Sequence, residues 1–175
     1  MPTTAGQLIP YNVLTATPDV CRDDKAIADR LEAILNAYEG PSTAYTPTWT
    51  ADTTNPTIGN GTINGSYKRL GAGGKLIYVQ FQILFGSTTA YGNGVYAVAL
   101  PVAPAAGKYA ILPVFFNTAG GYAEGLMSVS MQTPAMQGPS AAGSSIIVPV
   151  GHTGVAGGAW ASGGWIIGSG MYEAA

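Results

Sequence analysis

Residues 75–85 constrain the fold of this chain more than any other segment, because apolar side chains occupy every second position. These side chains belong to Ile77, Val79, Phe81, Ile83 and Phe85, and two glutamines and a tyrosine lie among the positions between them. Successive side chains of a β-strand point to opposite faces of the sheet. The pattern therefore predicts a long strand with one buried face, which requires a sheet with a core on one side.

Several other segments are short, rich in β-forming residues and separated by turns. They are residues 45–50, 61–70, 95–100, 109–116, 125–132, 145–150 and 165–172. The glycine-rich residues 71–74 predict a hairpin loop in front of residues 75–85. Pro113 lacks a backbone N–H, which predicts that its strand lies at a sheet edge or contains a bulge. Short strands with frequent turns are typical of an antiparallel β-sandwich, and we expect a jelly-roll-like arrangement.

Charge is distributed unevenly along the chain, although only 9% of its residues are charged. Residues 1–40 contain three basic and six acidic side chains, whereas residues 41–175 contain four basic and three acidic ones. The change coincides with a Gly-Pro pair at residues 40–41, which is typical of a linker. We expect an extended N-terminal arm over residues 1–16, a helix over residues 17–40 and a β domain over the remainder.

The helix is predicted by its boundary residues and by the spacing of its apolar side chains. Thr17 followed by Pro18 is a typical start, and Gly40 is a typical end. Six residues at alternating spacings of four and three share one face: Val20, Asp24, Ile27, Leu31, Ile34 and Tyr38. Such a stripe favours either a helix packed on its own β domain or a short oligomerisation helix with Asp24 in the seam. The sequence leaves both interpretations open.

The segment ahead of the helix shows no clear hydrophobic period and contributes little to a core of its own. Its residues Leu8, Ile9, Pro10 and Tyr11 are predicted to be extended. Such a segment can become ordered by contact with a partner surface. We therefore expect this arm to attach the protein to a larger assembly.

Few side chains of this chain could carry out catalysis. The β domain contains three carboxylates, Asp52, Glu124 and Glu173, and nothing in their spacing pairs two of them as a glycosidase requires. The only histidine, His152, lies in a segment typical of a turn, and the only cysteine, Cys21, lies in the predicted helix. These residues are too few to build a metal site. We predict no enzymatic activity, no metal and no cofactor.

Other classes of function are disfavoured by charge and hydropathy. A net charge of −2 provides no basic surface for nucleic acid. No run of 18 apolar residues is present, so we expect no membrane-spanning segment, and the first ten residues lack the features of a secretory signal. The glycine-rich residues 71–75 do not match a phosphate-binding loop, because Leu76 follows the lysine where such loops have serine or threonine.

Aromatic residues are the remaining candidates for binding. Trp160 lies inside the glycine-rich residues 157–165, and Trp165 ends that segment. An exposed ring can stack on a sugar, which predicts a glycan contact at these two residues. Rings buried in a core or a subunit interface serve as packing anchors instead. Both interpretations remain open from the sequence.

Several segments together carry a resemblance that covers most of the chain. They are Tyr45-Thr-Pro-Thr-Trp-Thr50, Pro56-Thr-Ile-Gly-Asn-Gly-Thr-Ile-Asn-Gly-Ser-Tyr67, residues 75–85, 94–101 and 165–175, and in front residues 9–14, 17–20 and 26–32. These segments resemble minor virion proteins of bacteriophages, notably those of actinobacteria. The resemblance implies an N-terminal attachment segment, a short helix and a β-sandwich displayed outward, often as a trimer. It implies no catalytic residue.

From these observations we expect a non-enzymatic phage virion surface protein, made in the host cytoplasm and assembled as a homotrimer. Its arm is expected to bind capsid or tail proteins. A capsid decoration or head fibre is favoured, because the chain is short for a fibre that must reach the cell. One alternative is a tail-fibre or tail-tip protein that binds a host cell-surface glycan. Another is a glycan depolymerase, whose activity would depend on Asp52 or Glu124.

Overall fold

The computed structural model describes residues 20–71, 73–129, 135–139, 147–151 and 159–175. Within them the chain is mainly β with one helix, as the sequence predicts. Some predictions fall outside the described residues, namely those for the arm over 1–16 with Leu8, Ile9, Pro10 and Tyr11, for Thr17 and Pro18, and for His152.

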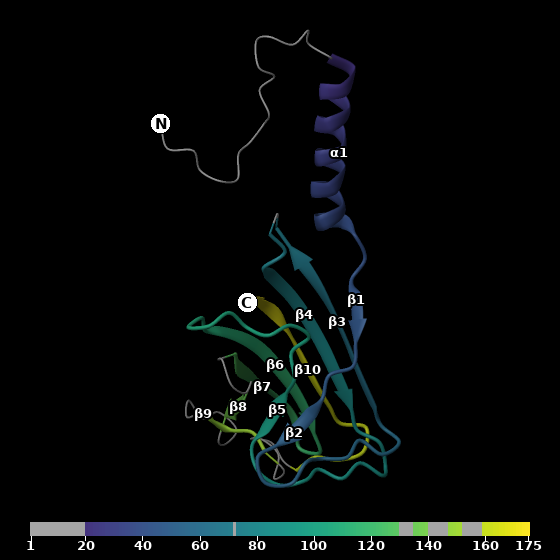
Figure 1. Cartoon of the computed structure of the whole chain (residues 1–175). Coiled ribbons are helices and arrows are strands. Elements are labelled where there is room, and N and C mark those ends of the chain that lie inside the picture. The colour runs from purple at the N-terminus through teal and green to yellow at the C-terminus, as the bar shows by residue number, and fades with distance from the viewer. Residues whose placement is uncertain (1–19, 72, 130–134, 140–146, 152–158) are drawn as a thin grey trace.

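The helix α1 spans Val20–Glu39 and ends where the sequence predicts. The backbone N–H of Gly40 donates to the carbonyl oxygen of Asn36 at 2.8 Å, and this bond closes the last turn. On the helix surface, Lys25 Nζ lies 2.8 Å from Asp29 Oδ2, an exposed pair one turn apart that adds little to stability. Figure 1 shows that α1 extends away from the β domain.

In the part of the chain that the structure describes, ten strands form one antiparallel sheet. They are β1 (Thr43–Tyr45), β2 (Trp49–Ala51), β3 (Thr62–Leu70), β4 (Leu76–Leu84), β5 (Tyr96–Val98), β6 (Ala110–Thr118), β7 (Gly121–Val129), β8 (Ala135–Pro139), β9 (Ile147–Pro149) and β10 (Trp165–Glu173). Hydrogen-bonded neighbours follow the order β1-β3-β4-β10-β6-β7-β8-β5-β2, and β9 pairs with β8. The long strands β3, β4, β10, β6 and β7 therefore lie side by side (Figure 1).

Two differences from the prediction concern the number of strands. The strand predicted over residues 45–50 is two strands, because β1 pairs with β3 whereas β2 pairs with β5 at the far end of the sheet order. The residues between them carry the chain from one end of the order to the other. The strand β8 was not predicted, because Gly138 and Pro139 are typical of a turn.

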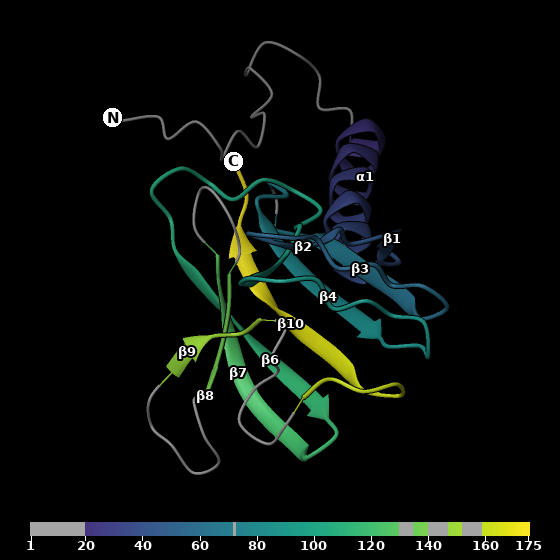
Figure 2. The same cartoon turned by 90° about the horizontal axis from the view of Figure 1, so that it is seen from below.

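The sheet curls around one hydrophobic core (Figure 2). In β4 the predicted alternation is confirmed, and its buried residues are Ile77, Val79, Phe81 and Ile83. Aromatic rings from distant parts of the chain meet inside the curl. The ring of Trp49 in β2 stacks on that of Phe85, directly after β4, with centroids 5.5 Å apart. This contact joins the last strand of the sheet order to one of its central strands.

Glycines in the inner layer make room for large rings. In the register of the sheet, Gly65 lies between Tyr45 and Phe81, and Phe81 lies opposite Gly168. A Cβ at Gly65 would come within 2.5 Å of the Tyr45 ring, and a Cβ at Gly168 would collide with the Phe81 ring. Small and large residues thus alternate along a line across the sheet, which fills the interior without collisions.

Both alternatives predicted for the strand with Pro113, a sheet edge or a bulge, are wrong, because its register against β7 runs without interruption from Ala110 to Thr118. This strand, β6, lies between β10 and β7. Pro113 is exposed and lies opposite Leu126 of β7, whereas the pairing of β6 with β10 extends only as far as Val114. Pro113 therefore lacks its N–H at a position where β6 is no longer paired with β10. This position explains how an interior strand tolerates the proline.

Candidate functional site

The apolar stripe of α1 is exposed along the part of the helix whose side chains are described. The exposed fraction is 61% for Ile27, 55% for Leu31, 43% for Ile34 and 46% for Leu35. Apolar residues at this spacing are buried when a helix packs on its own domain. These four residues are called here the helix stripe. Within the described residues, the β domain does not cover them.

The contact between α1 and the β domain is at the C-terminal end of the helix, beside β3. There Asn36 and Gly40 line a hollow of about 220 Å³ together with Tyr67, Lys68 and Arg69. The helix is thus joined to the sheet through a short junction. Its preceding turns extend beyond the sheet (Figure 1).

All six residues predicted for the oligomerisation seam belong to α1. In heptad notation, Asp24, Leu31 and Tyr38 take the a positions and Val20, Ile27 and Ile34 take the d positions. Leu35 lies next to the seam and widens its apolar surface. The side chains of Val20 and Tyr38 are not among those that the structure describes. The exposure of the seam is therefore established for its middle residues, from Asp24 to Ile34.

A second feature is the surface of the long strands that faces away from the core, called here the outward face. Two neighbouring rows of side chains cross it in the register of the sheet. One row consists of Asn64, Gln82, Ile167, Phe115 and Glu124, and the other of Thr62, Leu84, Trp165, Asn117 and Tyr122. Phe115, Leu84 and Tyr122 are exposed. Exposed apolar and aromatic side chains gathered on one face are typical of an interaction surface.

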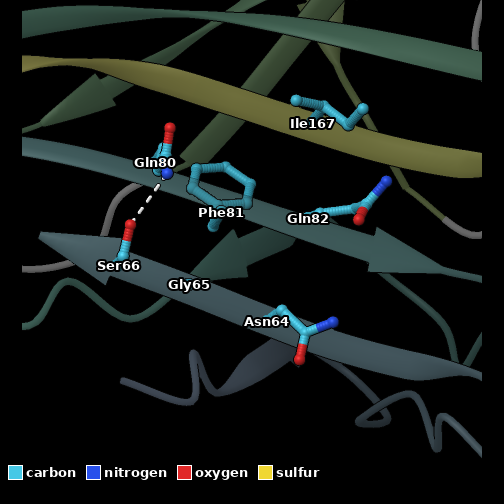
Figure 3. A pocket seen from close by; sticks show the side chains of 7 residues that line it. All are labelled: Asn64, Gly65, Ser66, Gln80, Phe81, Gln82 and Ile167. Carbon is cyan, nitrogen blue, oxygen red and sulfur yellow. Dashed lines mark hydrogen bonds between the residues drawn. The ribbon is translucent and has the colours of Figure 1, made fainter. Parts of the chain in front are cut away.

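The outward face contains a hollow of about 450 Å³ (Figure 3). It is lined by Asn64, Gly65 and Ser66 of β3, Gln80, Phe81 and Gln82 of β4, and Ile167 of β10. Gln80 Nε2 donates to Ser66 Oγ at 2.8 Å. Among the described residues, the side chains of Asn64 and Gln82 have no hydrogen-bond partner. The hollow is thus bordered by polar amides and carries no charged group in its lining.

Two aromatic rings next to the hollow form a pair on the outward face. The ring centroids of Tyr122 and Trp165 lie 6.0 Å apart. Tyr122 is 80% exposed, and Trp165 is half-buried. Trp165 lies two residues before Ile167 on β10, so both side chains point to the same side of the sheet. The glycan contact at Trp165 stays a prediction, and Tyr122 is a neighbouring ring that the sequence did not identify.

Trp160 takes no part in this surface. Only 6% of it is exposed, and its ring packs 5.3 Å from that of Phe85, measured between centroids. Its indole N–H donates to the carbonyl oxygen of Gly151 at 2.8 Å. A buried ring cannot stack on a sugar, so the contact predicted for Trp160 is corrected to a core position. The sequence could not separate the two tryptophans, because both belong to one glycine-rich segment.

Of the three carboxylates considered for catalysis, two make hydrogen-bond or ion-pair contacts within the β domain and the third is exposed. Asp52 Oδ1 accepts a hydrogen bond from the backbone N–H of Val95 at 2.7 Å. Glu173 Oε2 lies 3.4 Å from Lys108 Nζ, and Glu124 is exposed on β7. The described part of the chain contains no group of three or more potential metal ligands. None of its helices is long and apolar enough to cross a membrane.

Burial raises the pKa of Tyr45, Tyr91, Tyr96 and Tyr172 above the usual value of about 10. Two of these hydroxyls donate hydrogen bonds inside the β domain. The Tyr96 hydroxyl donates to the carbonyl oxygen of Tyr91 at 2.6 Å, and the Tyr172 hydroxyl to that of Val102 at 2.7 Å. Because they stay protonated at neutral pH, these two groups act as hydrogen-bond donors that tie loops to the core.

Comparison of the chain with protein-family models, with curated proteins and with solved structures finds no match. The helix stripe and the outward face are therefore the observations that bear on function.

Proposed function

We propose that this chain is a non-enzymatic surface protein of a bacteriophage virion, a capsid decoration or head fibre, which assembles as a homotrimer through α1. The observation that carries the proposal is the exposed helix stripe on a helix that extends away from the β domain. The phage assignment draws on the sequence resemblance. The assembly draws on the physical chemistry of the helix.

The helix stripe supports self-assembly because α1 has little else to stabilise it. Most helical stability in proteins comes from packing an apolar face, and the described side chains of α1 are all exposed. A bundle of copies would bury the stripe of each copy against the others. Leucine at a with isoleucine at d favours three or four helices over two. Leu31 at a, with Ile27 and Ile34 at d, follows this pattern and supports a trimer over a dimer.

The β domain is the displayed part of the particle in this proposal. We propose that the two ends of its curled sheet face each other as a jelly-roll-like sandwich. The stacking of Trp49 on Phe85, and the packing of Trp160 with centroids 6.0 Å from Tyr96, support this arrangement. Both contacts join segments that are distant in the chain.

The arm over residues 1–16 is proposed to bind capsid or tail proteins. A trimer would present three arms from one bundle, and linked contacts bind far more tightly than a single one. A short helix followed by a compact β domain has little reach. This small reach favours the head of the virion over a fibre that must contact a cell.

A second candidate is a tail-fibre or tail-tip protein that recognises a host cell-surface glycan. The pair of Tyr122 and Trp165 on the outward face favours it, because its rings lie together and one of them is largely exposed. The same helix assembly would present three copies of this pair to a cell surface.

Immunogold labelling of intact virions with an antibody against residues 45–175 tests the proposed function. We expect gold on the head. Gold at the tail tip would replace the first candidate by the second. Intact particles that stay unlabelled, although their denatured proteins react with the same antibody, would contradict outward display of the β domain.

A further inference from the structure

We infer that the outward face holds a binding site for a neutral oligosaccharide, centred on the hollow between β3, β4 and β10. The site extends along β10 to the ring pair of Tyr122 and Trp165. It goes beyond the assembly role proposed above. It deepens the second candidate function, on which it rests only for the biological source of the sugar.

Two amides at the hollow are free to bind a ligand. Asn64 and Gln82 lie opposite each other on β3 and β4 and are both exposed. Neither side chain has a hydrogen-bond partner among the described residues. An amide offers both donors and an acceptor, which matches the hydroxyl groups of a sugar, since each hydroxyl also donates and accepts. Gln80 is instead held by Ser66, and this bond fixes the wall beside them.

The lining of the hollow favours an uncharged ligand. None of its residues is charged, so a phosphate, sulfate or carboxylate would find no cation within the lining to pair with. Its volume of about 450 Å³ lies within the usual range of small-molecule sites, roughly 300–1,000 Å³. A neutral saccharide satisfies both conditions.

The aromatic pair supplies an apolar contact at one side of the hollow. Ile167 lines the hollow, and Trp165 follows on the same face of β10, about 7 Å away along the strand. Tyr122 then continues the surface beside Trp165. An oligosaccharide has hydroxyl groups at its rim and C–H groups on its ring faces. The amides and the aromatic rings are therefore suited to successive units of one chain.

The position of the hollow separates this ligand from a peptide strand. Peptides that extend a sheet use a free strand edge, whereas β4 has β3 on one side and β10 on the other. The ligand would therefore lie across the face of the sheet, held by side chains.

The test is binding of the full-length protein to a glycan array printed with neutral hexose and pentose oligosaccharides beside sialylated and sulfated ones. The strongest neutral oligosaccharide is then titrated by calorimetry. We expect neutral glycans to be retained. Gln82→Val should weaken binding roughly three- to tenfold, because the variant loses the amide hydrogen bonds but keeps a strand-forming residue. Tyr122→Ala should weaken it by a similar factor.

A matched control is Tyr109→Ala, because Tyr109 is 84% exposed, as open as Tyr122, but lies outside the site. Its binding should be unchanged. Retention of no neutral glycan, a preference for sulfated or sialylated glycans, or equal binding by all three variants and the parent would overturn the inference. A fall in oligomer mass in Gln82→Val or Tyr122→Ala would instead make the face an interface between copies. Calorimetry reports the affinity of each site, whatever the number of chains in the assembly. A loss of glycan binding is therefore distinguishable from a failure of the proposed trimer.

Discussion

At the residue scale, the interior is shaped by aromatic rings that lie over glycines. Phe81 covers Gly168 and Tyr45 covers Gly65, and any Cβ at either glycine would enter the volume of the ring. Neither glycine has a positive φ. Both are therefore required for the space they leave and not for an unusual backbone conformation.

Replacement of Gly168 by alanine should lower the free energy of unfolding by about 1–3 kcal/mol, because the added methyl forces the Phe81 ring out of its place. Denaturant unfolding followed by tryptophan fluorescence measures this change. The control is Gly73→Ala, where the nearest atom to the new Cβ would be Lys75 Cγ at 3.9 Å. Equal midpoints for the two variants would show that the ring does not depend on the glycine.

At the element scale, α1 differs from the strands in what stabilises it. Each long strand is held by neighbours and by the core, whereas the described side chains of α1 are exposed from Asp24 to Asn36. The helix stripe would therefore gain most from copies of the same helix. The polar face opposite it, with Lys25 and Asp29, remains suited to solvent.

The double variant Ile27→Asn, Leu31→Asn should reduce the mass in solution from three times 17.8 kDa to that of one chain. Two buried aliphatic side chains would be lost from each helix of the bundle, and polar groups would take their place in its interior. Sedimentation equilibrium measures the mass. The variant Lys25→Ala, Asp29→Ala changes the opposite face and should remain trimeric. If the double asparagine variant keeps the parent mass, α1 is not the seam.

At the scale of the whole molecule, sparse charge and buried tyrosines govern the response to pH. The hydroxyl of Tyr45 is buried and has no hydrogen-bond partner among the described residues. Burial raises its pKa far above the usual value, so the folded state keeps its proton at a pH where the unfolded state loses it. The associated stability is fully present below about pH 10, the unfolded pKa. It is lost progressively as the pH rises from there toward the folded pKa.

The free energy of unfolding should therefore begin to fall steeply above about pH 10. Tyr45→Phe should lessen this fall, since it removes one titrating hydroxyl. At pH 7 the same variant should be more stable by about 1 kcal/mol, because it removes a buried polar group without a partner. Urea unfolding at pH 7, 9.5 and 11 checks both effects. A steeper alkaline loss in Tyr45→Phe than in the parent would refute the assignment.

The sequence predicted the candidate surfaces only in part. The spacing of Ile27, Leu31 and Ile34 was sufficient to predict a stripe on one helix face, but whether the β domain covers it depends on how the helix leaves the sheet. On the outward face, the alternation of residues 75–85 already placed Gln82 opposite the core side. The position of Asn64 opposite Gln82 could not be predicted, because it depends on the register of β3 against β4.

The sequence by itself determined the features that depend on the spacing of nearby residues: the buried side of β4, the apolar stripe of α1 and its end at Gly40. Only the tertiary structure decided which strands are neighbours. It placed Pro113 in an interior strand where no N–H is needed, and it buried Trp160 while leaving Trp165 on the outward face. The reason is physical: periodicity acts within a few residues of chain, whereas pairing and the curl of a sheet join residues that are far apart in the sequence.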